Sequence, residues 1–167
     1  MGPQVSKLQN EEMELDAPKP FLRWAGGKRR LADLIIRSLP GNFDTDKARY
    51  FEPFVGGGAV MFALGDQSQS VFIPGGRIHI NDSNPDLISS YQAIQEDVNN
   101  LIAQLKKYSR NTSREAYEKI RALKTSDPIA KAARFIYLNK TCFNGLWRVN
   151  SKGEFNVPRS EEHTSEL

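Results

Sequence analysis

A glycine-rich segment and an acidic residue after it could together bind a nucleotide-like ligand. The segment Glu52-Pro-Phe-Val-Gly-Gly-Gly-Ala59 has the pattern of a strand that ends in glycines and opens a helix. Glycines at such a turn let the backbone approach a ligand without a Cβ in the way. Asp82 follows 24 residues after Gly58, near the spacing at which an acidic side chain meets ribose hydroxyls. A plain tight turn and a helix N-cap would explain the same pair, so this pattern alone leaves both interpretations open.

The segment Phe21-Leu-Arg-Trp-Ala-Gly-Gly-Lys28 adds three further ligand-binding features. Trp24 can offer a ring face, the glycine pair permits close backbone approach, and Lys28 is a cation suited to a carboxylate. The alternative is a loop before a basic helix N-terminus. That alternative is weak, because three adjacent basic residues at this position oppose the helix dipole.

A later block, Asn139 to Pro158, carries residue types that contact DNA bases. Phe143 is an aromatic that can wedge into a base stack, and Arg148 is of the type that reads guanine edges. Both lie beside a tight loop at Gly145. Ordinary core packing would equally explain Phe143 and Leu146 if they stood alone.

The motifs in this order resemble DNA adenine-N6 methyltransferases of the Dam type. FLRWAGGK, EPFVGGG, NDSNPDLI and FIYLNKTCFNGLWRVNSKGEFNVP cover about residues 20–158. The resemblance implies S-adenosylmethionine as methyl donor, and it implies that the residues in contact with this cofactor are Trp24, Lys28, Glu52, Phe54, Gly56, Gly58 and Asp82. It also implies double-stranded DNA with a GATC-like site as substrate, contacted by Arg23, Phe143, Asn144, Leu146 and Arg148. We expect the protein to be a monomer.

The catalytic motif of that family, Asp-Pro-Pro-Tyr, is missing from the chain. Adenine N6 is a poor nucleophile because its lone pair is delocalised into the ring, and the motif hydrogen-bonds and stacks on the flipped-out base. The only Asp-Pro pair is Asp127-Pro128, whose position favours a helix cap. We therefore assign no catalytic residue and expect an inactive fragment that lacks the chemical motif.

The elements that must position these residues alternate between strand and helix. Apolar spacing predicts helices over 29–39, 59–64 and from Pro85 through Leu105, with short strands over 49–54 and 77–81. Strand, glycine turn, helix and strand form a βαβ unit with parallel strands. The expected fold is an incomplete α/β, Rossmann-like methyltransferase domain.

A helical DNA-recognition insert is expected to follow. A capping box at Thr112–Glu115 and a helix start at Ser126–Pro128 predict two more helices, and 146–158 predicts a hairpin. The expected parts are a flexible leader (1–19), an S-adenosylmethionine-binding part (20–98), a DNA target-recognition part (99–158) and a tail (159–167). The tail resembles a translated sequencing adapter, so we interpret it as non-native.

Charge separates the two main parts. Residues 21–98 have a net charge of −1, whereas residues 99–158 hold 12 basic and 4 acidic side chains, a net charge of +8. Such asymmetry is typical of a part that contacts a polyanion. A well-solvated, lysine-rich helical face explains it equally well.

Composition sets the broad class. The chain is 39% hydrophobic and 26% charged, as in soluble globular proteins. Its single cysteine, Cys142, excludes an internal disulfide, and two histidines argue against a metal centre. We find no apolar run long enough for a membrane span and no secretory signal, so we expect a cytoplasmic protein.

Two rival functions remain. One is a non-catalytic fragment that binds DNA or S-adenosylmethionine, which downstream sequence with Asp-Pro-Pro-Tyr would decide. The other is a nicotinamide-dependent oxidoreductase. It is disfavoured by the basic second half and by Met61, which stands where the dinucleotide fingerprint needs a third glycine after Gly56 and Gly58.

Overall fold

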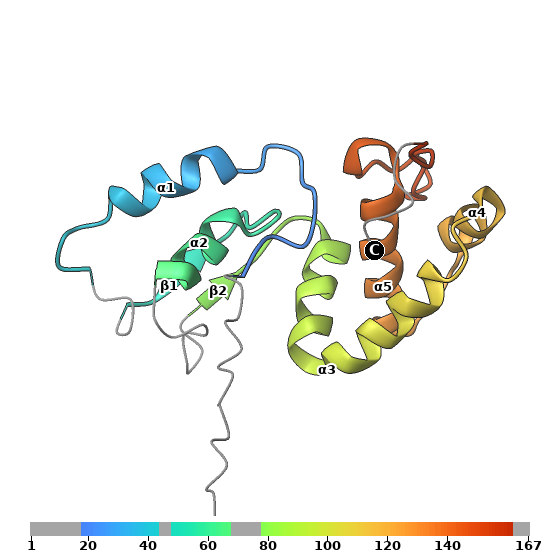
Figure 1. Ribbon diagram of the computed structural model, residues 1–167, viewed down its shortest axis with the longest axis horizontal. Coiled ribbons are helices and arrows are strands. Elements are labelled where there is room, and N and C mark those ends of the chain that lie inside the picture. Colours follow the sequence, from blue (N-terminus) through green and yellow to red (C-terminus); the bar gives the residue numbers. More distant parts are fainter. Residues whose placement is uncertain (1–17, 44–47, 68–77, 162–167) are drawn as a thin grey trace, which may run out of the picture.

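The computed structural model describes residues 18–43, 48–67 and 78–161. Along the chain these ranges contain α1 (Arg29–Arg37), β1 (Tyr50–Glu52), α2 (Ala59–Gln67), β2 (Ile78–Ile80), α3 (Pro85–Ser109), α4 (Arg114–Ala122), α5 (Pro128–Thr141) and a short 3-10 helix, η1 (Phe143–Gly145). Figure 1 shows α1, α2 and the strands on one side and α3 to α5 on the other, with the segment before α1 running between them. Residues 1–17 of the expected leader and 162–167 of the expected tail lie outside the described ranges.

The two strands pair in parallel, as the βαβ pattern predicts. Tyr50 is opposite Ile78, and Glu52 is opposite Ile80. Two further main-chain bonds extend the pairing beyond the strand ends, from Val55 N to Asn81 O and from Asn81 N to Glu52 O, both 2.9 Å. The fold is therefore mixed α/β, and within the described ranges its sheet has two strands.

Helix α1 begins where the sequence predicts, but its apolar stripe lies largely at the surface. Ala32 is its buried residue, whereas Leu31 and Leu34 are 52% and 62% exposed. The side chain of Phe51 in β1 is also exposed and stacks on His79 at 4.6 Å between ring centroids. Much of the apolar surface on this side of the molecule is therefore not covered by the described residues.

The main core lies between α3 and α5. It is formed by Leu22, Leu87, Ala93, Leu101, Ala132, Ala133, Phe135 and Ile136. Helix α3 is kinked at Asp97 (φ −154°, ψ 68°), whose carboxylate accepts a hydrogen bond from Asn100 N at 3.2 Å. The sequence predicts one continuous apolar stripe here, but Val98 and Ile102, just after the kink, are exposed. The kink changes the direction of the stripe, which explains the difference.

The helix starts follow capping chemistry. Asn84 caps α3, and Asp127 caps α5 by accepting from Ile129 N at 2.8 Å, with proline at the first helical position in both. The capping box predicted at Thr112–Glu115 is wrong by one residue. Ser113 is the N-cap of α4 and accepts from Ala116 N, because the Asn111 side chain accepts from Ser113 N and sets the turn before it.

The predicted hairpin is present in a minimal form. Val149 and Phe155 form an antiparallel bridge, and the Asn150 side chain organises the turn by accepting from Lys152 N and Glu154 N, each at 2.9 Å. The chain after the hairpin returns to α5, where Ser160 N donates to Thr141 O at 2.9 Å. Residues 159 and 160, assigned above to a non-native tail, therefore pair with the end of α5, at Cys142 and Thr141.

Candidate functional site

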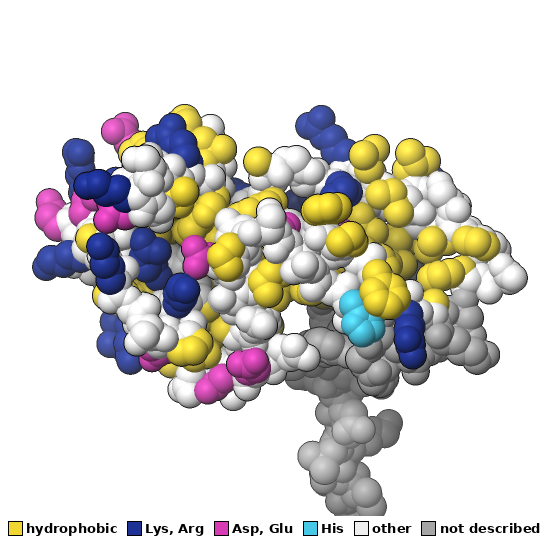
Figure 2. All heavy atoms as spheres, turned by 180° about the vertical axis from the view of Figure 1, so that it is seen from behind, with side chains coloured by type: hydrophobic (Ala, Val, Ile, Leu, Met, Phe, Trp, Pro, Cys, Tyr) yellow, Lys and Arg dark blue, Asp and Glu magenta, His cyan; other side chains and the backbone are white. Residues whose placement is uncertain are grey.

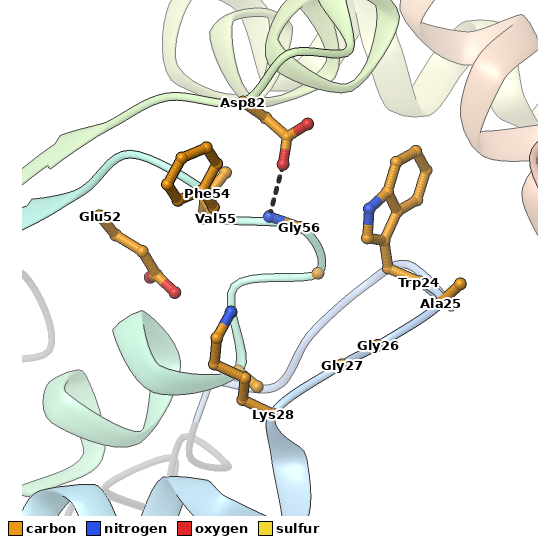
Figure 3. Close-up of a pocket in the computed structure, with 12 residues that line it drawn as sticks. Trp24, Ala25, Gly26, Gly27, Lys28, Glu52, Phe54, Val55, Gly56 and Asp82 are labelled. Carbon is orange, nitrogen blue, oxygen red and sulfur yellow. Dashed lines mark hydrogen bonds between the residues drawn. The ribbon is translucent and has the colours of Figure 1, made fainter.

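A pocket of about 190 Å³ brings together Asp82 and the two segments predicted to bind a ligand (Figure 3). Its lining consists of Trp24, Ala25, Gly26, Gly27, Lys28, Glu52, Phe54, Val55, Gly56, Gly57, Ala59 and Asp82. All the residues predicted to contact the cofactor are among them except Gly58. Gly26, Gly27 and Gly57 belong to the two glycine segments expected to permit close approach, whereas Ala25, Val55 and Ala59 lie within those motifs but were not predicted.

The Gly56 peptide is fixed from both sides. Its N–H donates to Asp82 Oδ2, and its carbonyl accepts from the Tyr91 hydroxyl, both at 3.0 Å. The other carboxylate oxygen of Asp82 accepts from Asn84 N at 3.0 Å. Asp82 therefore joins the glycine turn to the start of α3, whose N-cap is Asn84. A carboxylate offers about four acceptor positions, so Asp82 keeps capacity for a ligand hydroxyl.

The absence of a Cβ at the glycines of the turn leaves space for side chains of other segments. A Cβ on Gly56 would lie 2.9 Å from Cδ1 of Trp24, and one on Gly58 would lie 2.8 Å from the Tyr91 hydroxyl. Both glycines have positive φ, 52° and 74°. The close approach predicted for a ligand is thus made, in this structure, by the Trp24 ring and by Tyr91. Gly56 leaves space for that ring beside the pocket, and Gly58 is not among the lining residues.

Opposite charges face one another across the pocket. The side chains of Lys28 and Glu52 point toward each other (Figure 3). The Tyr50 hydroxyl donates to Glu52 Oε2 at 2.7 Å. Burial raises the pKa of Glu52, although this hydrogen bond and the charge of Lys28 act in the opposite direction. A cation and a half-buried carboxylate side by side can hold a zwitterionic group.

Two aromatic rings complete the pocket. Trp24 packs on Phe135 of α5 with ring centroids 5.9 Å apart, which ties the pocket to the main core. Phe54 is 72% exposed. An exposed ring at a pocket rim offers a flat face on which a planar ligand can stack.

The predicted DNA-contacting residues form a second cluster at the end of α5. In η1, Asn144 and Gly145 have positive φ, 53° and 63°, which makes the tight loop expected at Gly145. Phe143 is 51% exposed and Leu146 44% exposed, so the core-packing alternative for these two is wrong. A Cβ on Gly145 would lie 2.5 Å from Cβ of Arg23, so the loop touches the segment before α1.

Arg148 lies just beyond this loop. Its Nε donates to Asn156 Oδ1 at 2.8 Å, and Asn156 N donates to Arg148 O at 3.0 Å. The hairpin thus orients the guanidinium. Together with Arg23, Phe143, Asn144 and Leu146, Arg148 forms what we call the reading cluster. Asn139, a fully buried residue that contacts both Arg23 and Gly145, was not predicted from the sequence as a site residue. The sequence feature that could have indicated it is a polar side chain directly after four apolar residues of the α5 helical pattern, 135–138.

The surface follows the charge asymmetry of the sequence. Figure 2 shows Lys and Arg side chains gathered over the side formed by α3 to α5, with Asp and Glu among them, while hydrophobic side chains gather on the opposite side. In the described ranges no group of three His, Cys, Asp or Glu side chains could hold a metal ion. None of the helices described has the length and apolarity needed to cross a membrane.

Comparison with known proteins gives a consistent result. The family model of D12 class N6 adenine-specific DNA methyltransferases matches residues 24–165. The chain is 40% identical over 153 residues to the type II methyltransferase M.MjaIII of Methanocaldococcus jannaschii, covering 84% of this chain and 51% of that protein. It is 39% identical over 145 residues to a DNA adenine methylase of Haemophilus influenzae, covering 84% and 46%. The chain therefore spans about half the length of these curated relatives.

Proposed function

The chain belongs to the D12 class of N6 adenine-specific DNA methyltransferases, and we propose that it forms the parts of such an enzyme that bind S-adenosylmethionine and read double-stranded DNA. The observation that carries this proposal is the pocket in which an indole, an ammonium and two carboxylates converge from three segments. The reading cluster meets the Trp24 segment at Arg23, which Gly145 approaches closely.

The chemistry of the pocket fits S-adenosylmethionine. Lys28 would hold the carboxylate of the methionine end, and Glu52 would hold its ammonium. Asp82 would accept hydrogen bonds from the ribose hydroxyls, and the Trp24 ring face suits a cation. When bound, this cofactor supplies an electrophilic methyl group. The residues named here would bind and orient it.

We propose that the parallel pair β1 and β2, with α2 between them in sequence, belongs to a Rossmann-like sheet. Parallel strands joined through a helix are the unit from which such sheets are built. The glycine turn after β1 and Asp82 after β2 both lie at the carboxyl ends of parallel strands, where ligands bind in such folds.

We propose that the reading cluster recognises the DNA site, with the +8 part of the chain contacting phosphates. The resemblance of the loop favours a GATC-like site. An enzyme that modifies cellular DNA would act in the cytoplasm of a bacterium or archaeon, or of a cell infected by a phage. The sequence holds no Asp-Pro-Pro-Tyr, so we assign the polarisation of adenine N6 to no residue of this chain.

Isothermal titration calorimetry with S-adenosylmethionine and with NAD tests the proposal and its oxidoreductase rival together. We expect saturable binding of S-adenosylmethionine at one site and none of NAD. Preference for NAD would overturn the proposal. DNA binding is tested by competition between a GATC duplex and its single-base variants at fixed salt, where equal affinity for all duplexes would remove the reading role.

A further inference from the structure

Asn139, in the last turn of α5, is a buried amide that contacts two distant segments. Its side chain is fully buried. Its Oδ1 accepts from Arg23 N at 2.9 Å, and its Nδ2 donates to Arg23 O at 2.7 Å. The same Nδ2 donates to Gly145 O at 3.0 Å. One carboxamide therefore pairs with both main-chain groups of Arg23, as a neighbouring strand would, and also with the loop of the reading cluster.

These bonds use both N–H donors of the amide and one of the two acceptor positions of its oxygen. An asparagine offers two N–H donors and one acceptor oxygen, and burial without partners would be costly. Both donors and one acceptor position are bound to main-chain groups of Arg23 and Gly145, so these bonds hold the side chain in one orientation. Asn139 therefore acts only on the segments it holds.

In the proposed function, the segment of Arg23 and the loop of Gly145 contact different ligands. On one side Arg23 is followed by Trp24, which lines the pocket and packs on Phe135. On the other side Gly145 follows Phe143 and Asn144. The segments also touch directly, since a Cβ on Gly145 would lie 2.5 Å from Cβ of Arg23. A shift of either main chain must therefore move the other or break these contacts.

We infer that Asn139 is a positioning residue that holds the cofactor-binding segment and the DNA-reading loop in one fixed arrangement. This rests on the proposed function, since it assigns the cofactor to the Trp24 side and DNA to the Gly145 side. Loss of the amide should weaken cofactor binding and DNA discrimination together, although Asn139 touches neither ligand.

The test variant is Asn139→Asp. It keeps the shape and one acceptor, but it places an oxygen opposite the carbonyls of Arg23 and Gly145. The matched control is Thr141→Val, two residues along the same helix. Thr141 is also buried, but its hydroxyl donates within α5, to Tyr137 O at 2.7 Å. Both variants lose a buried polar interaction, and only Asn139→Asp affects the two segments.

Three quantities are measured for each variant: thermal stability, affinity for S-adenosylmethionine, and the ratio of affinities for a GATC duplex and its single-base variants. The ratio is independent of the folded fraction, because the same folded molecules bind every duplex. We expect Asn139→Asp to weaken cofactor binding roughly ten-fold, as expected for lost buried hydrogen bonds, and to bring the ratio toward one. Thr141→Val should lower stability alone.

The inference is overturned if Asn139→Asp, folded at the temperature of measurement, keeps the wild-type ratio and cofactor affinity. It is also overturned if Thr141→Val causes the same two losses. If Asn139→Asp does not fold, Gly145→Ala tests the same junction from the loop side, and unchanged cofactor affinity in that variant would count against it. A wild-type chain that binds no S-adenosylmethionine or prefers no duplex removes the proposed function itself, which these controls distinguish.

Discussion

The Asp82 carboxylate has a structural role in the fold in addition to the cofactor-binding role that we propose for it. It accepts hydrogen bonds from Gly56 N and Asn84 N, so it shapes the glycine turn before any ligand arrives. Lys28 differs, because its side chain is exposed and makes no cap hydrogen bond at the start of α1. The two residues of one pocket should therefore respond differently to truncation.

We predict that Asp82→Ala lowers both stability and affinity for S-adenosylmethionine, whereas Lys28→Ala lowers affinity alone. Each lost charge-assisted bond should cost about 1.5–3 kcal/mol of binding. The unpaired amides of Gly56 and Asn84 should cost Asp82→Ala roughly 1–3 kcal/mol of stability. Thermal unfolding and calorimetry measure the two effects. An Asp82→Ala protein that is less stable but binds the cofactor normally would assign Asp82 a structural role only.

The raised pKa of Glu52 predicts a pH dependence of stability. Because the folded state holds this proton more tightly than the unfolded state, the free energy of unfolding falls as pH rises from the ordinary glutamate value, 4.5, through the folded pKa. Glu52→Gln removes the buried charge. We expect it to flatten this part of the profile and raise the melting temperature at neutral pH while weakening cofactor binding.

Melting curves from pH 4.5 upward measure this effect, with Glu96→Gln as an exposed control for the change in net charge. A Glu52→Gln profile parallel to that of the wild type would show that burial does not perturb this carboxyl. Glu52→Gln is thus expected to gain stability and lose cofactor affinity, because the charge proposed to bind the cofactor is costly to bury in the folded protein. Such a trade-off between stability and function is common at binding sites.

At the scale of elements, local chemistry predicted most of the starts and some of the packing. Asp127-Pro128 is recognisable as a helix start because proline fits the first turn and aspartate accepts its free amides. The predicted start of α4 was wrong by one residue, because the Asn111 side chain forms a turn with Ser113 N before the helix begins. The kink at Asp97 was missed, since it depends on a side chain that caps within a helical pattern.

In the candidate site, too, local motifs could be predicted from the sequence and a long-range contact could not. Motif residues predicted the pocket lining, because glycine, lysine and acidic residues at turns carry a recognisable pattern. Asn139 could not be predicted, because its partners are the main chain of Arg23, 116 positions away, and of Gly145. Long-range hydrogen bonds to main-chain atoms leave no pattern of residue types on the partner side.

The hairpin after α5 orients Arg148, and we predict that Arg148→Ala selectively reduces discrimination between DNA sites. The Nε bond to Asn156 uses one of the five N–H groups of the guanidinium, and its terminal amines can pair bidentately with a guanine edge. The expected loss is roughly 1–3 kcal/mol of discrimination at one base pair. Competition between single-base variants of the duplex at fixed salt measures it.

Lys124→Ala is the control for charge alone. Its ammonium lies 3.4 Å from Glu154 and is highly exposed. If it contacts DNA, it should weaken binding to all duplexes equally, as a phosphate contact does. If Arg148→Ala also lowers all affinities by one common factor, Arg148 is a phosphate anchor or a structural residue.

At the scale of the whole molecule, binding and chemistry are assigned to different stretches of sequence. The chain spans about half the length of its curated relatives. It contains a candidate pocket and a reading cluster, and its sequence lacks Asp-Pro-Pro-Tyr. Binding needs the first two features, whereas methyl transfer also needs a group that polarises adenine N6.

We predict that the 167-residue chain does not methylate DNA. The measurement is transfer of a radiolabelled methyl group to a GATC duplex, with purified protein and a relative that contains the motif as positive control. Incorporation into adenine at a rate that follows the concentration of this chain would contradict the prediction. Fusion to the motif-containing half of a relative should restore transfer if the two halves assemble.

The contact between Gly145 and Arg23 also bears on how recognition could diversify. The atoms of Arg23 nearest a Cβ at position 145 are Cβ, Cδ and Cγ, at 2.5, 3.0 and 3.3 Å. The loop therefore packs against the aliphatic stem, and the main chain is held by Asn139 whatever headgroup follows. Exchanges such as Arg23→Lys or Arg23→Gln preserve most of that stem. If Arg23 contacts DNA as proposed, exchange of its headgroup would change that contact while the stem packing on Gly145 and the main-chain bonds to Asn139 are kept.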